Sequence, residues 1–196
     1  MKDSKIEELI YNLSLNKGFS KKNSERIIFD LITSKDRIVK FKDIINYIEE
    51  SLSECPICFY YTENQICEIC QNSQRDKNQI CVVSSISDAH TIEKSNLFKG
   101  VYHVLKGEIN LNKNKTPDKL TINELLSRVN ENSEVILALN STFEGEVTAN
   151  FIAGILRKKT KKITRIAKGI PFGGMLDYID DTTLKIAIKN REKYED

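Results

Sequence analysis

Four of the five cysteines lie within sixteen residues and form two C-x2-C pairs, Cys55 with Cys58 and Cys67 with Cys70. Each pair can bring two thiolates to one ion, and four thiolates in a tetrahedron make the closed coordination shell of a structural Zn²⁺ site. Because no position stays open for water, this pattern favours a role in folding over catalysis. A segment this short buries too little apolar surface to fold alone, and zinc binding, worth about 10–16 kcal/mol in comparable modules, supplies the missing free energy.

Three other states of these cysteines stay open from the spacing: a pair of disulfides, free buried thiols and an iron–sulfur cluster. The N-terminal segment MKDSKIEELIYN carries acids and lacks the apolar stretch of a signal peptide, so we expect a cytoplasmic protein, in which disulfides are disfavoured. No apolar run approaches the roughly 20 residues that span a bilayer, so no membrane partner is expected. The fifth cysteine, Cys81, opens a predicted strand and is expected to be a small buried hydrophobic residue.

A pair of carboxylates, Glu144 and Glu146, is the second group that could do chemistry, in the segment NSTFEGEVTANF (140–151). The segment directly follows an apolar run, where a strand should give way to a helix, and catalytic groups of α/β proteins collect at the carboxyl ends of strands. Mg²⁺ prefers such charged oxygen ligands. The same acids would also stabilise the first turn of a helix through its dipole, by about 0.3–1 kcal/mol each.

A glycine turn in the segment LNKGFSKKNSER is the third candidate, because Gly18 separates two amphipathic patterns. In a helix-hairpin-helix motif such a turn points backbone N–H groups and the start of the next helix at a phosphate. Lys21, Lys22 and Arg26 would line the same end. The motif's usual second glycine and proline are replaced here by Ser20 and Lys21, so an ordinary helical hairpin with a solvated basic face stays open.

The elements that must position these groups follow from the hydrophobic period. The first fifty residues have helical spacing, with apolar stripes such as Ile27, Ile28 and Leu31. The period then changes, and the segments expected as strands are QICVVSSI, GVYHVLKG, EVILALN and KITRIAKG. Helical patterns at 88–94, 121–130 and 144–158 separate them, which predicts right-handed βαβ units and a mostly parallel sheet. Thr121 and Glu124 have capping-box spacing, and Asp180 or Asp181 is expected to cap a short helix in the tail.

The whole chain therefore predicts an α+β protein of several modules. We expect a helical hairpin module at 1–53, a four-cysteine zinc knuckle at 54–76, an α/β domain at 77–169 and a C-terminal helical tail that serves assembly at 170–196. The net charge of +2 at pH 7 provides no whole-molecule field for a polyanion, so nucleic-acid binding must come from local patches. The densest basic run, RKKTKKITR (157–165), is by default a solvated face, with the lining of a ring or a nucleic-acid contact as the alternative. His90 and His103 lack a second ligand at useful spacing and are expected to be structural or surface residues.

The order of these modules resembles the bacterial recombination-mediator family RecR over nearly the whole chain. The knuckle and the strings CVVSSISDAHTIE, ILALNSTFEGEVTANFIAGIL and RIAKGIPFGGMLDYIDDTTL carry the resemblance. It implies a Toprim domain after the knuckle and a C-terminal segment that helps to build a homo-oligomer, a dimer or a tetrameric ring. It also implies a non-enzymatic clamp on single- and double-stranded DNA that acts with RecO, and in many bacteria RecF, to help load RecA onto single-stranded DNA.

The chain departs from the catalytic pattern of Toprim enzymes at three positions. Those enzymes need a glutamate after the first strand, where this chain has Ser84, and aspartates after the third strand, where it has Asn140 and Thr142. These neutral side chains cannot replace carboxylates in acid–base or two-metal chemistry. We therefore expect no catalytic residue, and the resemblance implies that Glu144 and Glu146 contact RecO. The alternative hypothesis is an Mg²⁺-dependent Toprim nuclease or topoisomerase-like enzyme.

Overall fold

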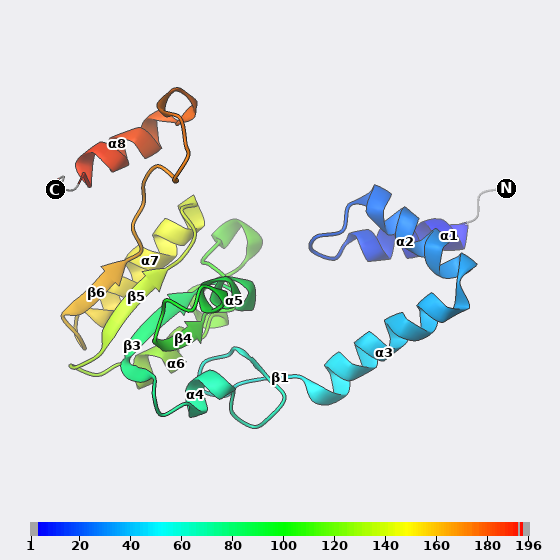
Figure 1. Cartoon of the computed structure of the whole chain (residues 1–196), viewed down its shortest axis with the longest axis horizontal. Helices are drawn as coiled ribbons and strands as arrows, with labels where there is room; N and C mark the ends of the chain where they lie inside the picture. Colours follow the sequence, from blue (N-terminus) through cyan, green and yellow to red (C-terminus); the bar gives the residue numbers. More distant parts are fainter. Residues whose placement is uncertain (1–3, 192, 194–196) are drawn as a thin grey trace. The chain divides into compact units, whose positions relative to one another are not determined.

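The computed structural model describes residues 4–191 and residue 193, and it divides the chain into two compact units at the Ser53–Glu54 bond (Figure 1). The described part of the first unit is helical, and the second contains two sheets. None of the described helices is long and apolar enough to cross a membrane. The predicted α+β class and the predicted mixture of modules are confirmed.

Three helices make up the described part of the first unit: α1 (Ser4–Ser14), α2 (Lys21–Thr33) and α3 (Lys35–Ser51). α1 and α2 pack against each other, with Ile10 buried. Ser34 ends α2 and caps α3, because its side chain accepts a hydrogen bond from the backbone N–H of Arg37. α3 keeps its apolar residues largely exposed, Ile44 at 57% and Ile45 at 54%. The described part of this unit therefore leaves an apolar helix face uncovered by its own residues.

The second unit opens with a small two-stranded sheet, formed by β1 (Ser53–Glu54) and β2 (Tyr61–Thr62), and the short helix α4 (Glu68–Gln71). A larger sheet of four strands follows in the described residues, in the order β4-β3-β5-β6, with all neighbours parallel. Its members are β3 (Asp76–Val83), β4 (Gly100–Val104), β5 (Glu134–Ala138) and β6 (Lys162–Arg165). All four predicted strands and the predicted parallel sheet are confirmed.

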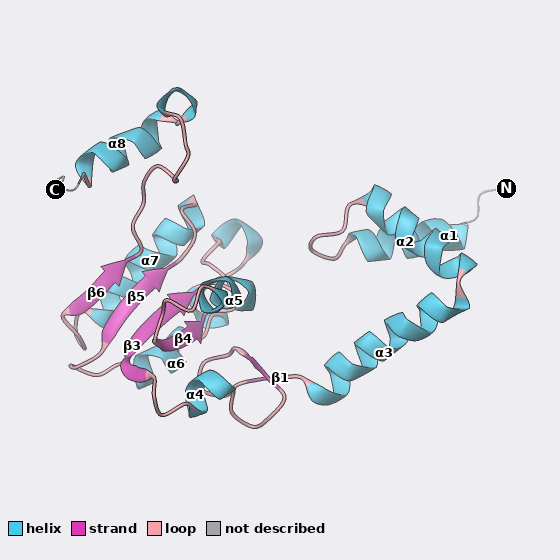
Figure 2. Ribbon diagram, in the orientation of Figure 1, coloured by secondary structure: helices cyan, strands magenta, loops and turns pink. Residues whose placement is uncertain are grey.

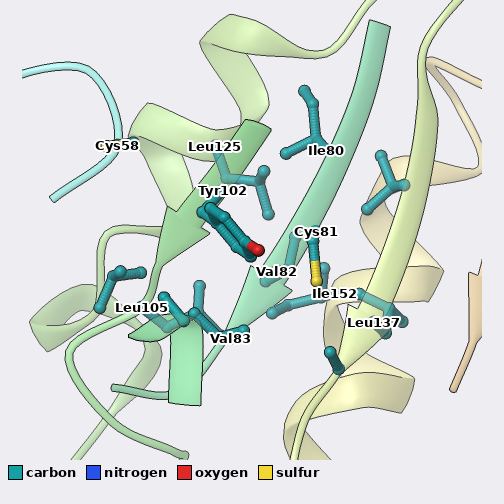
Figure 3. Packing of buried hydrophobic residues seen from close by; sticks show 14 of the residues in the cluster. Cys58, Ile80, Cys81, Val82, Val83, Tyr102, Leu105, Leu125, Leu137 and Ile152 are labelled. Carbon is teal, nitrogen blue, oxygen red and sulfur yellow. The ribbon is translucent and has the colours of Figure 1, made fainter. Parts of the chain in front are cut away.

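Helices cover both faces of this sheet (Figure 2). Right-handed connections place α5 (Ile86–Lys94) on one face and both α6 (Ile122–Arg128) and α7 (Phe143–Leu156) on the other. Consecutive residues at the end of β3, Ile80 to Val83, are therefore all buried, as is usual for a central parallel strand. Figure 3 shows them beside Tyr102 of β4, Leu125 of α6 and Ile152 of α7.

The structure differs from the sequence expectation at two element ends. β3 begins at Asp76, before the expected strand QICVVSSI, because pairing with β4 extends the strand through polar residues. The capping box predicted at Thr121 and Glu124 is wrong. Thr121 precedes α6 but its hydroxyl donates to the carbonyl of Val104 at 2.7 Å and makes no capping bond.

The C-terminal segment contains the short helix α8 (Asp181–Lys189), which Asp180 caps by accepting from the backbone N–H groups of Thr182 and Thr183, as predicted. Before it the chain turns at Gly173, whose φ of +82° is a conformation that favours glycine. The large apolar side chains around this turn are exposed, namely Phe172, Met175, Leu176 and Tyr178. This segment therefore offers an uncovered apolar surface.

Candidate metal centre and the carboxyl edge of the sheet

The four paired cysteines converge on one point. Their sulfur atoms all lie within 4.8 Å of one another, and Cys55, Cys58 and Cys67 are buried. Four sulfurs held about 2.3 Å from one ion are about 3.8 Å apart, so the cluster has the size of a tetrahedral zinc site. It is the one group of three or more potential metal ligands in the described part of the chain.

Local backbone structure places each pair of cysteines. In the first pair, the Phe59 N–H donates to the Cys55 carbonyl at 2.9 Å and the Cys55 N–H donates to the Tyr60 carbonyl at 2.7 Å, so the chain folds back tightly. Phe59 takes a positive φ of 62° to complete this turn. In the second pair, Cys67 caps α4, since its sulfur accepts from the Cys70 N–H at 3.4 Å. The backbone thus aims both pairs at one ion.

The electrostatics of the cluster favour a bound cation. Hydrogen bonding from Cys58 and then Cys70 lowers the pKa of Cys67, while the hydrogen bond to Cys67 raises that of Cys58. One thiolate is therefore stabilised by protons left on its neighbours, and four thiolates cannot coexist at this spacing unless a metal replaces those protons. No disulfide forms among the described cysteines.

The knuckle is attached to β4, the edge strand of the large sheet. The Val104 N–H donates to the Cys58 carbonyl at 2.8 Å. The knuckle therefore satisfies a backbone N–H that an edge strand would otherwise leave unpaired. Lys106 follows β4, forms an ion pair with Glu54 and lies 4.9 Å from the ring centre of Phe59. These contacts make the knuckle part of the α/β unit.

A buried network lies under this attachment. Arg128 of α6 donates to the Tyr102 carbonyl at 2.8 Å and to His103 Nδ1 at 3.0 Å. His103 Nε2 then donates to the Thr121 carbonyl at 2.7 Å. Burial, and secondly the charge of Arg128, lower the pKa of His103 to about 3, so this histidine stays neutral. It is a structural residue, one of the two roles that the sequence suggested.

Arg128 is also attracted electrostatically to the cysteine cluster. Burial lowers the pKa of its guanidinium, and attraction to the four cysteines opposes that shift, with Cys70 contributing most. Arg128 forms no ion pair with a carboxylate among residues 4–191. A zinc ion with four thiolates carries a net charge of about −2, and this buried cation offsets part of it. No pattern in the sequence pointed to Arg128, because it lies far along the chain from the cysteine pairs.

The strand register gathers the second candidate site at the carboxyl edge of the large sheet. Val83 pairs with both Val104 and Ala138, so the three strands end level. The residues that follow, Ser84 after β3 and Asn140 after β5, lie close enough for the Asn140 amide to donate to the Ser84 hydroxyl at 3.3 Å. These are two of the three positions where the chain lacks an expected carboxylate.

Ser84 is buried and belongs to a capping structure. Its hydroxyl donates to Asp88 Oδ2 at 2.6 Å. The same oxygen accepts from the backbone N–H of Ser85 at 2.9 Å, which closes a capping box at the start of α5. Asp88 thus helps to cap the start of α5.

Glu108 is a further acid at this edge, and the sequence reasoning missed it. It comes from the polar loop after β4 and accepts from both the amide side chain and the backbone N–H of Asn140, at 3.0 and 3.2 Å. The Thr142 hydroxyl donates to its other oxygen at 3.3 Å. A Cβ at Gly145 would lie 2.1 Å from the Asn140 carbonyl, so only glycine fits beside this loop.

The two predicted acids lie in the first turn of α7 but have separate partners. Glu144 Oε1 accepts from the Asn110 side chain at 2.9 Å. Glu146 Oε1 pairs with Lys168 at 2.6 Å and with Arg165 at 2.8 Å. These hydrogen bonds, Lys168 first, lower the pKa of Glu146. The acids of this edge therefore each satisfy a different neighbour, and their oxygens do not converge as the four sulfurs do.

The glycine turn of the first unit has the expected local conformation. Gly18 has a φ of +92°, and Ser20 caps α2 by accepting from the Asn23 N–H at 3.2 Å. Gly18 and Arg26 line the same hollow of about 420 Å³, whereas Lys21 and Lys22 stand exposed in the first turn of α2. These three cations form no ion pair within the described residues.

A parallel sheet with a four-cysteine knuckle on its edge strand defines a Toprim-type protein with a zinc-binding module. Family models agree with this class: the four-cysteine zinc finger domain of RecR matches residues 52–72, the Toprim domain matches 78–167, and the C-terminal domain of RecR matches 169–192. Recombination protein RecR of Dehalococcoides mccartyi is 38% identical over 192 residues, which cover 96% of this chain and 94% of the relative. The Rickettsia felis protein of the same name is 41% identical over 198 residues, 98% of each chain.

The chain therefore belongs to the RecR family of recombination proteins. Its cysteine cluster is one structural zinc site, as predicted, with Cys55, Cys58, Cys67 and Cys70 as the ligands. The family places the protein in recombination and DNA repair.

Proposed function

We propose that this protein is a non-enzymatic DNA clamp of recombinational repair. It acts with RecO, and with RecF where that protein is present, to help load RecA onto single-stranded DNA. One observation carries the non-enzymatic part: the acids at the carboxyl edge of the Toprim sheet are individually paired, and neutral Ser84, Asn140 and Thr142 stand between them. Such an edge lacks the clustered charged oxygens that phosphoryl-transfer metals need.

The helical hairpin supplies the DNA contact in this proposal. Lys21, Lys22 and Arg26 lie on the first two turns of α2, directly after the Gly18 turn, and the start of the helix favours an anion. Contacts to phosphate give affinity without sequence preference and weaken steeply as salt rises. Several hairpins in one oligomer would add avidity, because they act on the same strand.

Charge reversal tests the hairpin. Lys22→Glu combined with Arg26→Glu is expected to abolish binding of a fluorescent single-stranded oligonucleotide at low salt, while the oligomer survives in light scattering. Lys35→Glu with Lys40→Glu is the matched control, because both lysines are exposed in the same unit and neither lines the hollow of Gly18 and Arg26. Unchanged affinity in the Lys22 and Arg26 variant would remove the hairpin from the mechanism.

Assembly into a dimer or tetrameric ring is proposed from uncovered apolar surfaces. The apolar residues of α3 and those beside Gly173 are exposed in groups, and grouped exposed apolar residues are typical of an interaction surface. Burying them against other copies of the chain would stabilise a ring. Light scattering with and without DNA tests this: a protein that stays monomeric under both conditions contradicts the clamp.

Glu144 and Glu146 are proposed to contact RecO. Beside them, Phe143 is 81% exposed, and Val147 and Phe151 follow it at helical spacing as partly exposed apolar residues. An apolar anchor flanked by acids is a usual composition for a protein interface. In a pull-down with the cognate RecO, Phe143→Ala and Glu144→Lys are each expected to reduce capture. Full capture by both variants would refute this surface.

The alternative, an Mg²⁺-dependent Toprim nuclease or topoisomerase-like enzyme, gains one feature from the structure, the additional acid Glu108 at the carboxyl edge. The proposal expects no cleavage of single- or double-stranded DNA with Mg²⁺. Cleavage that is lost in Glu144→Gln would establish the enzyme instead.

A further inference from the structure

A basic hollow lies at the amino end of the same sheet, where α7 gives way to β6. Five exposed cations line it, and we call them the basic groove: Arg157, Lys158, Lys159, Lys161 and Lys162. The hollow measures about 390 Å³, and Glu131, Asn132 and Thr160 complete its lining. Because all strands are parallel, it lies at the end of the sheet opposite to the acids of the carboxyl edge.

The backbone under these cations is fixed. The N–H groups of Lys159 and Thr160 both donate to the Leu156 carbonyl, at 2.8 and 3.0 Å. Thr160 is buried, and its hydroxyl donates to the carbonyl of the buried Ser133 while accepting from the Lys162 N–H at 3.1 Å. This loop therefore holds its charged side chains over a defined surface.

The charges of the basic groove are not neutralised locally. None of its five cations forms an ion pair with a carboxylate of the described residues. Glu131 lines the hollow, and Glu134 is the register partner of Lys162, but Glu134 accepts its hydrogen bond from Gln79 at 3.0 Å. By contrast, Arg165 at the end of β6 and Lys168 beyond the strand both form ion pairs with Glu146.

Two ordinary roles explain only parts of this cluster. Cations after a helix interact favourably with its dipole, which accounts for Arg157, Lys158 and Lys159 but not for the two lysines that enter β6. A lysine on an edge strand discourages pairing with other chains, which accounts for Lys162 alone. Neither role explains why all five line one hollow without forming an ion pair among the described residues.

We propose that the basic groove binds the phosphate backbone of DNA, as a second contact in addition to the helical hairpin. The inference rests on the proposed DNA-clamp function and adds a site on the Toprim domain. A backbone contact fits because lysines on a fixed loop bind phosphates as point charges and read no bases. The position also separates roles on one domain, with DNA at the amino end of the sheet and the protein partner at the acidic carboxyl end.

Salt-dependent DNA binding tests this site. Lys158→Gln with Lys161→Gln should lower the slope of log affinity against log salt by about 1.4 for single-stranded and about 1.8 for double-stranded DNA, if each lysine neutralises one phosphate. Lys113→Gln with Lys119→Gln is the matched control, because both are exposed lysines of the same unit in the loop after β4. The control should leave the slope unchanged, and circular dichroism should confirm that both variants are folded.

The variant with Lys22→Glu and Arg26→Glu, measured in parallel, distinguishes failure of the basic groove from failure of the DNA-clamp function. If the wild type binds DNA and the groove variant keeps its affinity and slope, the basic groove is refuted while the clamp stands. If the wild type fails to bind DNA even at low salt, the proposed function fails, and this inference with it. An equal loss of slope in the Lys113 and Lys119 control would mean that only general surface charge is at work, which also refutes a defined groove.

Discussion

The zinc knuckle and the carboxyl edge of the Toprim sheet both carry four potential metal ligands, yet only one of them is built to hold a metal. In the knuckle the four sulfurs lie within 4.8 Å of one another, and hydrogen bonds from Cys58 and then Cys70 lower the pKa of Cys67. At the carboxyl edge, Asp88, Glu108, Glu144 and Glu146 each have partners of their own. Convergence of the ligand atoms on one point distinguishes the two regions.

The difference shows that a Toprim sheet can keep its shape without a convergent set of charged ligands at its carboxyl edge. The sheet, the level strand ends and the helix after β5 all remain. Neutral side chains at Ser84, Asn140 and Thr142 then accept or donate hydrogen bonds where a metal would need charge. The knuckle has no such substitutions: all four of its ligand positions are cysteines, and four ligands close a tetrahedral zinc shell.

Loss of a zinc ligand should have the largest effect. Cys58→Ser is expected to unfold the knuckle or aggregate the protein, because zinc binding of about 10–16 kcal/mol is comparable to the whole stability of a domain. Cys81→Ala is the control: it removes the fifth cysteine, which is buried in β3 with its pKa raised by burial to about 12. Elemental analysis should find one zinc per chain in the control. A folded Cys58→Ser protein with full zinc occupancy would show that Cys58 is not needed to hold the ion.

Removal of the buried counter-charge should have an intermediate effect. Arg128→Met is expected to weaken zinc affinity about 10- to 100-fold, because the charge beside the four cysteines and the hydrogen bonds to His103 and Tyr102 are lost together. Zinc transfer to a colorimetric chelator measures the change, with Arg157→Met as an exposed control. Arg128→Lys should retain part of the affinity, since it keeps the charge. Equal zinc transfer from wild type and Arg128→Met would exclude a role in zinc binding.

Breaking the ion pairs of Glu146 should have a small effect. Glu146 is 40% exposed, so Glu146→Gln should lower the free energy of unfolding at pH 7 by less than about 1 kcal/mol. Its pKa is lower in the folded protein than in the unfolded chain, where it is about 4.3. The contribution is therefore present above pH 4.3 and is lost as the pH falls through the lowered value.

Denaturant unfolding of wild type and Glu146→Gln over this pH range measures that contribution. Both proteins carry the same zinc site, so the difference between them isolates the carboxylate. If the difference in free energy of unfolding between the two proteins grew as the pH fell, the assignment of the ion pairs to Glu146 would be contradicted.

The features that could be predicted from the sequence are those with local causes. The C-x2-C pairs, the alternation of strands and helices, and the caps at Ser20 and Asp180 all depend on residues a few positions apart. The Thr121 capping box failed, although its spacing was right, because tertiary packing takes that hydroxyl to the Val104 carbonyl. Local spacing cannot show such competition.

Glu108 and Arg128 could not be predicted because their partners are distant in the sequence. Glu108 meets Asn140 only because β4, β3 and β5 are neighbours in the sheet with level ends. Arg128 meets Tyr102 and His103 only because α6 packs against the edge strand to which the knuckle is attached. Both contacts follow from strand order, which the periodicity of a single chain does not specify.

Direct Mn²⁺ binding to the zinc-loaded protein, followed by electron paramagnetic resonance, tests whether the acids at the carboxyl edge of the sheet bind a metal ion. Mn²⁺ takes the same hard oxygen ligands as Mg²⁺ and reports every bound ion. Wild type is predicted to have no saturable site in the millimolar range, because each acid of the carboxyl edge is already paired. A single saturable site that disappears in Glu108→Gln or Glu144→Gln would contradict the account and make this edge a metal site.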